Sequence, residues 1–393
     1  MPAIRTKSGI FIRENPELGL ITYNPFSGLF YACASKDKNK LLRWLNGNNS
    51  EPPSPIYKKT LGVGWDIAIK DAEYPTPHLL PSPNEWATVP PANMPILINW
   101  LITGNCPLAC KYCYAQDVMH GKYPEPDIKS INNIADKILS YDPLVVVLTG
   151  GDPIVSPHLE RAIKLLRNKV GIIVDTCGYS LKQEQIEMFR DYGVLIRISL
   201  DSEIPRINRF LRPVSTEFKT SNGGPFADSA KAALNAIVEC VDNDVKVTVH
   251  SVATKNNQSD FEAFGNKLFK LGVRGWRILL VSPCKANIKM YNKLIGDKTS
   301  QKRFYSRIVE QIMSKQRNTW YEGMSVQIIN NAIPNDVILV APDGTYLTES
   351  NLTKQNSGKV IIDLEAPKNP KIECIRTHVD MNAHTARYLY LHD

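Results

Sequence analysis

The chain has 393 residues, a formal net charge of +8 and 43% hydrophobic residues. This length allows one large α/β domain together with one or two small ones. There is no run of eighteen apolar residues, and residues 1–17 lack an apolar signal core. We therefore expect a cytoplasmic protein that does not span a membrane. The positive charge fits either a solvated basic surface or an acidic partner, and both interpretations stay open.

Residues 1–75 are predicted to form a small α+β domain. Three short strand-like stretches separated by turn residues come first. A helix is predicted over residues 38–47, because its leucines share one face and a glycine stands at its end. Residues 76–95 are rich in proline, which cannot donate to a central strand, and are predicted to be a linker.

From residue 96 onwards, short apolar runs alternate with amphipathic helical stretches. Continuous apolar runs are typical of strands that are covered on both faces, and this alternation favours a parallel sheet with right-handed crossovers. Six such strands predict an α/β fold with a partial (β/α)6 parallel barrel over residues 96–284. Residues 285–393 are predicted to be a C-terminal extension, with a helix over 300–320 and a hairpin that turns at residues 342–344.

Three of the eight cysteines, Cys106, Cys110 and Cys113, lie within eight residues. Three thiolates on one short loop can hold three irons of a cubane cluster, which leaves the fourth iron without a protein ligand. A structural zinc site is one alternative, but it needs four closed ligands and no second cysteine pair is nearby. Three unrelated thiols are the other alternative, and the compact spacing argues against them.

This cysteine spacing, with Tyr112 directly before the last cysteine, resembles the hallmark of the radical S-adenosylmethionine superfamily. Its position directly after the first barrel strand is also similar. The resemblance implies one [4Fe-4S] cluster, S-adenosyl-L-methionine (SAM) on the open iron, and an external electron donor of the flavodoxin or ferredoxin type. In that family one electron from the cluster cleaves SAM to a 5′-deoxyadenosyl radical, which takes a hydrogen atom from the substrate.

Later strand ends resemble elements that bind SAM in that family. The Gly-Gly-Asp-Pro stretch is similar to its Gly-Gly-Glu motif, with Asp in place of Glu, and a common turn is the alternative. The Ser-x-Asp element points two side chains the same way along a strand. The residues expected to contact SAM are Tyr112, Gly150, Gly151, Asp152, Pro153, Thr176, Ser199, Asp201 and Arg212. Strand C-termini are where parallel barrels place their chemistry, although Arg212 fits a surface position equally well.

The two ends of the chain suggest further roles. Cys284 follows the sixth strand, where a thiol can return a hydrogen atom to a substrate radical; a structural thiol is the favoured alternative. Beyond that strand only Cys284 and Cys374 remain, so a single cluster is predicted. The N-terminal domain resembles the winged-helix element with which ribosomal-peptide maturases capture a leader peptide by strand addition. The alternative is a domain that only caps the barrel.

The preferred function is radical modification of a peptide or protein substrate. The main alternative is modification of a nucleic acid or nucleotide, which the charge of +8 also fits. A non-catalytic iron–sulfur binding protein is disfavoured, because a structural cluster needs neither an open iron nor the later strand-end motifs.

Overall fold

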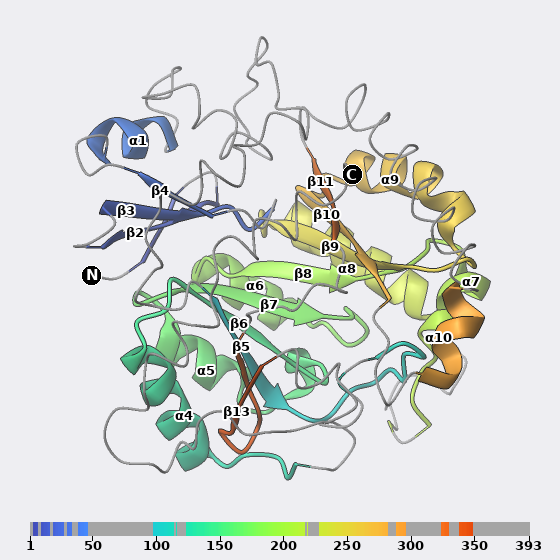
Figure 1. Ribbon diagram of the computed structural model, residues 1–393, viewed down its shortest axis with the longest axis horizontal. Helices are drawn as coiled ribbons and strands as arrows, with labels where there is room; N and C mark the ends of the chain where they lie inside the picture. Colours follow the sequence, from blue (N-terminus) through green and yellow to red (C-terminus); the bar gives the residue numbers. More distant parts are fainter. Residues whose placement is uncertain are drawn as a thin grey trace.

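The computed structural model comprises a small N-terminal sheet placed against a larger α/β sheet (Figure 1). The described residues are 3–6, 9–15, 19–26, 30–33, 38–45, 97–113, 115, 123–216, 218, 228–281, 288–295, 324–329 and 338–348. The predicted linker (76–95), the helix predicted over 300–320, Cys284 and Cys374 lie outside them. No helix among the described residues is both long and apolar enough to cross a membrane.

The N-terminal domain contains a four-stranded antiparallel sheet in the order β1-β2-β3-β4. Its elements are β1 Ile4–Arg5, β2 Phe11–Asn15, β3 Gly19–Tyr23, β4 Phe30–Cys33 and α1 Lys38–Leu45. The three predicted strands and the predicted helix are thus present, and β1 adds a short fourth strand.

The large sheet has the order β11-β10-β9-β8-β7-β6-β5-β12-β13. All neighbours are parallel except β12 and β13. The strands are β5 Leu97–Thr103, β6 Val145–Gly150, β7 Gly171–Thr176, β8 Leu195–Ser199, β9 Val247–Ala253, β10 Gly275–Leu280, β11 Ser325–Ile329, β12 Ile338–Val340 and β13 Tyr346–Thr348. The predicted partial parallel barrel is confirmed, and the six strands predicted over residues 96–284 are β5 to β10.

The two additional parallel strands come from the C-terminal extension, at opposite edges of the sheet. β11 pairs with β10, and β12 pairs with β5. β12 and β13 form the predicted hairpin, in which Gly344 has a φ of 85° that favours glycine. The extension therefore completes the sheet rather than forming one of its own.

Helices cover the outer face of this sheet. They are α4 Ile128–Ser140, α5 Leu159–Leu166, α6 Gln183–Asp191, α7 Pro205–Leu211, α8 Ser229–Asp242, α9 Phe261–Lys270 and α10 Ile288–Ile295, with short 3-10 turns at Pro153–Val155 and Gln258–Asp260. The side chains of Asp127 and Asp228 cap α4 and α8 by accepting backbone N–H groups. Outward-facing strand residues such as Ile98, Val146 and Ile196 pack with these helices in one buried core.

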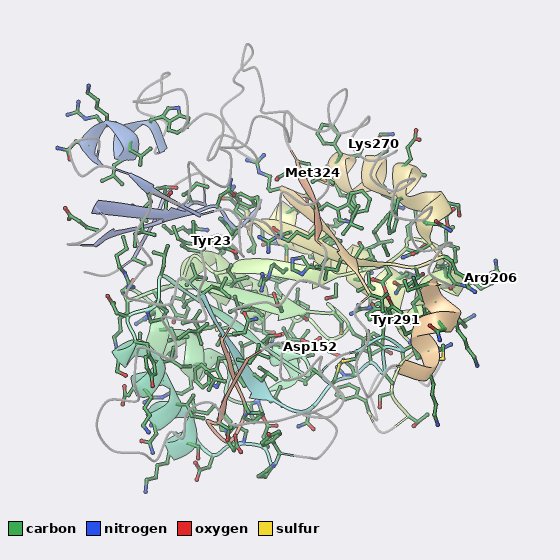
Figure 2. The ribbon with its side chains drawn as sticks, viewed as in Figure 1. Tyr23, Asp152, Arg206, Lys270, Tyr291 and Met324 are labelled. Carbon is green, nitrogen blue, oxygen red and sulfur yellow. The ribbon has the colours of Figure 1, made fainter. Side chains whose placement is uncertain are left out.

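The inner face of the sheet is closed at one end by the N-terminal domain. Phe11, Tyr23 and Phe26 are almost fully buried there. They pack against inward-facing residues near the N-terminal ends of the strands, namely Leu144, Val145, Val147, Ile173 and Leu195. In Figure 2, Tyr23 of β3 lies well away from Asp152, which follows the C-terminal end of β6 in the large sheet.

Two buried arginines join the same two domains. The Nη1 of Arg13 donates to the carbonyl oxygen and the carboxylate of Asp142, each at 2.6 Å, and its Nη2 donates to the Lys169 carbonyl at 3.1 Å. Arg277 on β10 donates to the Pro25 carbonyl at 2.7 Å. The two guanidinium groups thus donate hydrogen bonds to backbone carbonyls at the contact between the domains, where water is excluded.

Candidate metal centre

The three-cysteine motif lies in the loop that follows β5, at the C-terminal ends of the parallel strands. This loop is held against α7 and the residues after it by backbone hydrogen bonds: Lys111 N–H donates to the Leu211 carbonyl at 3.0 Å, and Ala109 N–H donates to the Pro213 carbonyl at 2.8 Å. The thiols of Cys106, Cys110 and Cys113 are half-buried and form no disulfide. The loop is therefore anchored, and its three thiols remain partly accessible.

The two glycines of the Gly-Gly-Asp-Pro stretch allow the cysteine loop to approach β6 closely. A Cβ atom at Gly151 would lie 1.9 Å from the Asn105 carbonyl oxygen, and Gly150 has a φ of 132°. In this contact Gly151 N–H donates to the Thr103 carbonyl at 2.8 Å, and Asp152 N–H donates to the Asn105 carbonyl at 2.7 Å. Only glycine fits at Gly151, because the opposing atom belongs to the backbone.

The carboxylate of Asp152 is buried and accepts hydrogen bonds within the protein. Its Oδ2 accepts from Thr176 Oγ1 at 3.0 Å and from Cys177 N–H at 2.9 Å, while its Oδ1 accepts from Ile154 N–H at 3.2 Å. Burial raises the pKa of Asp152, and these hydrogen bonds oppose that change. Asp152 and Thr176 were both expected to contact SAM; in the structure the two side chains hydrogen-bond to each other and join the ends of β6 and β7.

A second buried network joins the cysteine loop to the ends of β8 and β9. The hydroxyl of Tyr112 donates a short hydrogen bond to Asp201 Oδ2 and accepts one from Arg212 Nη1 at 2.7 Å. Asp201 Oδ1 accepts from Val252 N–H at 2.8 Å. Asn257 donates to the Asp201 carbonyl at 2.9 Å. Tyr112 is therefore fixed by its hydroxyl, in the loop segment between Cys110 and Cys113.

Ser199 and Asp201 do not line one cavity, contrary to the expectation from their spacing. Asp201 has no exposed surface, and its carboxylate is engaged by Tyr112 and Val252. The alternation of a strand fails here because β8 ends at Ser199. Ser199 itself is half-buried, and its hydroxyl has no hydrogen-bond partner among the described residues. Of this pair, Ser199 remains the candidate for contact with a cofactor.

Arg212 lies inside the site rather than on the surface, with 7% of its area exposed. Burial alone would lower its pKa, but the nearby groups of Cys110, Tyr112 and Asp201 together raise the pKa of Arg212 well above its usual value. It is a permanent cation beside the cysteine loop. Its Nε is buried and has no partner among the described residues.

These features fit an iron–sulfur cluster with a carboxylate-bearing ligand. Burial raises the pKa of the Cys106 and Cys110 thiols, so their thiolates need a positive charge, which bound iron would supply. Among the described residues, no three His, Cys, Asp or Glu side chains converge on a single ion; in a cubane cluster each thiolate binds a different iron. The unsatisfied Nε of Arg212 is a donor suited to a carboxylate.

Comparison with protein families identifies this part of the chain. Residues 100–268, which begin in β5 and end in α9, match the Radical SAM superfamily. The chain contains a radical SAM domain. The superfamily is one of enzymes, and the cysteine loop of this domain stands at the strand end that the resemblance implied.

Relatives of this radical SAM chain have several named activities. The chain is 26% identical over 204 residues to the PqqA peptide cyclase of Ruegeria pomeroyi, which covers 51% of each protein. It is 23% identical over 171 residues to the Fe-coproporphyrin III synthase of Methanosarcina barkeri, which covers 43% of this chain and 39% of the synthase. An uncharacterized protein of Methanocaldococcus jannaschii is 24% identical over 209 residues, 50% of this chain and 68% of its own length. The chain thus spans only about half, or less, of the two relatives with named activities.

Solved structures share the fold at low sequence identity. Streptococcus suis SuiB has a TM-score of 0.56 at 13% identity, covering 94% of this chain and 89% of SuiB. The anSMEcpe structure with bound AdoMet has a TM-score of 0.52 at 13% identity, covering 66% of this chain and 80% of that one. At such identities the likeness concerns the fold alone, and in SuiB it extends over nearly the whole chain.

The inner face of the radical SAM sheet carries an ion pair that the sequence did not reveal. Asp175 on β7 and Arg197 on β8 are register partners, and both carboxylate oxygens of Asp175 accept from Arg197, the longer bond measuring 2.8 Å. The Asp175 side chain is 26% exposed, while that of Arg197 is 8% exposed. Strand alternation could have placed both on the inner face, because Ile196 and Ile198 face the helices.

Glu125 contacts the cysteine loop, although no sequence pattern indicated it. Glu125, which precedes α4, accepts from Thr103 Oγ1 at 2.6 Å, from Asn105 Nδ2 at 2.9 Å and from Ser156 Oγ at 3.2 Å. It therefore joins the start of the cysteine loop to the segment after Asp152.

Cys177 is buried, as the structural interpretation of its thiol predicted. The suggested hydrogen-donor role of Cys284 stays a prediction, because that residue lies outside the described ranges.

Proposed function

We propose that this chain is a radical SAM enzyme that removes a hydrogen atom from a residue of a peptide or protein substrate. The observation that carries the proposal is the set of three thiols on one anchored loop, next to the buried cation of Arg212. When bound, the cluster and SAM would supply the 5′-deoxyadenosyl radical. Cys106, Cys110 and Cys113 would hold three irons, and the fourth iron would remain open to SAM.

The residues around the loop would orient the cofactor. Arg212 would bind the methionine carboxylate of SAM through its unsatisfied Nε. The hydroxyl of Ser199 would hydrogen-bond to SAM at the end of β8. Tyr112 and Asp201 would act as positioning residues, since they hold Arg212 and the cysteine loop together through their own hydrogen bonds.

The substrate would approach the inner face of the sheet below these residues. Half-buried polar side chains occur there, including Thr149, Asp175 and His250. The opposite end is filled by Phe11, Tyr23 and Phe26. Entry from the C-terminal ends of the strands is therefore the route that leaves the domain contact intact.

A peptide substrate is supported by two observations. Among the described residues β4 pairs only with β3, so its other edge can accept an added strand. The fold matches SuiB, whose structures include one bound to its precursor peptide SuiA, over 95% of this chain with a TM-score of 0.51. We propose that a leader segment adds to β4 while a separate segment reaches the cysteine loop at the far end of the strands.

A tetrapyrrole is the second candidate substrate, because relatives include an Fe-coproporphyrin III synthase and the AdoMet-dependent heme synthase of Nitratidesulfovibrio vulgaris. The two candidates differ in a simple assay. Coproporphyrin compounds would accelerate SAM cleavage if the heme-related function holds, whereas precursor peptides would do so if the peptide function holds.

The test is anaerobic reconstitution with iron and sulfide, followed by reduction with dithionite in the presence of SAM. We expect 5′-deoxyadenosine from the native chain and none from Cys110→Ala. Cys240→Ala is the matched control, because that thiol is buried on α8, and it should retain the activity. A fully loaded native cluster that yields no 5′-deoxyadenosine would contradict the proposed function.

A further inference from the structure

A basic surface with exposed apolar side chains lies beside the cysteine loop. The cationic side chains of α7 are Arg206 and Arg209, and those of α10 are Lys289 and Lys293; all four are exposed. Neither helix contains an acidic residue. Glu203, just before α7, is paired with Lys267 at 2.9 Å. We call these four residues, together with Lys111, Ile204 and Phe210, the α7–α10 surface.

Lys111 connects α7 to the cysteine loop. It stands between Cys110 and Cys113, and its Nζ lies 3.4 Å from the centroid of the Phe210 ring on α7. Figure 2 shows Arg206 on α7 and Tyr291 on α10 at the same edge of the molecule, and Figure 1 shows α7 beside α10 there.

This surface also exposes large apolar side chains. Phe210 is 42% exposed and Ile204 is 37% exposed, and the described residues contain only two other exposed large hydrophobic side chains, Ile128 and Val238. Exposed apolar side chains among charged ones are typical of protein–protein contacts. The charged side chains here have one sign of charge, which favours an acidic partner and fast, steered association.

We propose that the α7–α10 surface is the docking site of an acidic one-electron carrier protein. The inference rests on the proposed function, because only a cluster that must be reduced needs such a carrier. The carrier would be held against the loop that binds the cluster. A flavin hydroquinone on the carrier would lose one electron to become the semiquinone, and that electron would reduce a bound cluster from the 2+ to the 1+ state.

The test compares two double variants with the same change in net charge. Arg209→Glu/Lys293→Glu reverses two charges of the α7–α10 surface. Lys137→Glu/Lys270→Glu is the control, since these residues stand near the C-terminal ends of α4 and α9, at the end of the sheet away from the cysteine loop. None of the four residues touches the proposed cofactor site.

Two readouts are measured on the reconstituted full-length proteins. The first is the rate of cluster reduction by a fully reduced flavodoxin, followed by electron paramagnetic resonance at low salt. The second is the affinity of the oxidised flavodoxin for each protein, measured by calorimetry. We expect the surface variant to be slower by about tenfold or more and to bind more weakly, while the control variant matches the native protein.

Reduction by the small reductant titanium(III) citrate should be the same in all three proteins. Added salt should slow the native protein until it approaches the surface variant. Equal flavodoxin rates in the two double variants would overturn the proposal. So would a surface variant that keeps its flavodoxin rate but loses binding of an oligouridine RNA, which would assign the surface to a nucleic acid. If titanium(III) reduces the native cluster but no 5′-deoxyadenosine forms, the proposed function is contradicted. The flavodoxin measurements can still be compared between the two double variants in that case.

Discussion

The two ends of the parallel sheet carry different kinds of side chains. The N-terminal ends are sealed by apolar side chains of a separate domain, with Phe11, Tyr23 and Phe26 at the centre. The C-terminal ends carry half-buried thiols, together with the buried polar groups of Asp152 and Asp201. Burying such groups costs free energy unless each is hydrogen-bonded, and both carboxylates accept hydrogen bonds from the protein.

This difference predicts different consequences for substitutions at the two ends. The sealed end buries apolar area, which contributes to folding. The other end fixes the positions of Tyr112, Arg212 and the cysteine loop through buried polar contacts. Substitutions at the sealed end should therefore change stability alone, whereas those at the cluster end should change cluster loading or SAM binding as well as stability.

The largest effect should come from Gly151→Ala, at the cluster end. The new Cβ would lie 1.9 Å from the Asn105 carbonyl oxygen, and because that atom is backbone the cysteine loop must move, at a cost of about 3 kcal/mol. We expect reconstituted iron per chain to fall severalfold. Iron analysis beside circular dichroism tests this, and a folded variant with full iron content would show that the close approach is not needed.

Tyr112→Phe should come next. It leaves Asp201 and Arg212 in place but removes the hydroxyl that joins them, and hydrogen bonds to charged groups contribute about 1.5–3 kcal/mol. The free energy of unfolding should drop by about 2 kcal/mol in urea titrations, and the affinity for SAM should weaken because Arg212 loses its hydrogen bond to the cysteine loop. An unchanged free energy of unfolding together with an unchanged SAM affinity would show that the Tyr112 hydroxyl has neither role.

Gly171→Ala is the counterpart at the sealed end. Its Cβ would lie 2.6 Å from the ring of Phe11, a side chain that can shift, so we expect a loss of stability of about 1–2 kcal/mol. Iron content and SAM affinity should match the native protein below the unfolding temperature. A loss of iron without a loss of stability would reverse the proposed division between the two ends.

Asp142→Asn should have the smallest effect. Its carboxylate pairs with Arg13, but the Asp142 side chain is 63% exposed, so the pair contributes at most about 0.5 kcal/mol. Arg13 also keeps the carbonyls of residues 142 and 169 as acceptors. Thermal unfolding at low and high salt measures the difference, and a shift of several degrees would mean that the charge matters more than the carbonyls.

The sequence was informative wherever a local pattern decides the structure. The apolar run at residues 144–150 became β6, and the Pro-Asp-Gly turn became the β12–β13 hairpin. Local patterns could not predict that β11 and β12 join opposite edges of one sheet, since pairing depends on contacts between distant segments. The seal made by Phe11 and Phe26 escaped prediction for the same reason.

The site followed the same rule. The thiol spacing identified the cysteine loop, because three ligands lie within eight residues. The burial of Asp201 was not predictable, because its partners Tyr112 and Val252 come from other strand ends. Glu125 had no signal at all, since its three donors lie on separate segments.

The most direct test of the central claim is electron–nuclear double resonance on the reduced, reconstituted protein with SAM labelled by ¹⁵N at its methionine amine. We expect a coupling from that nitrogen to the cluster, because three cysteines would leave one iron open. We also expect that Arg212→Gln weakens SAM binding without loss of iron. A cluster signal that is indifferent to labelled SAM would contradict the claim that this loop holds an open-iron cluster.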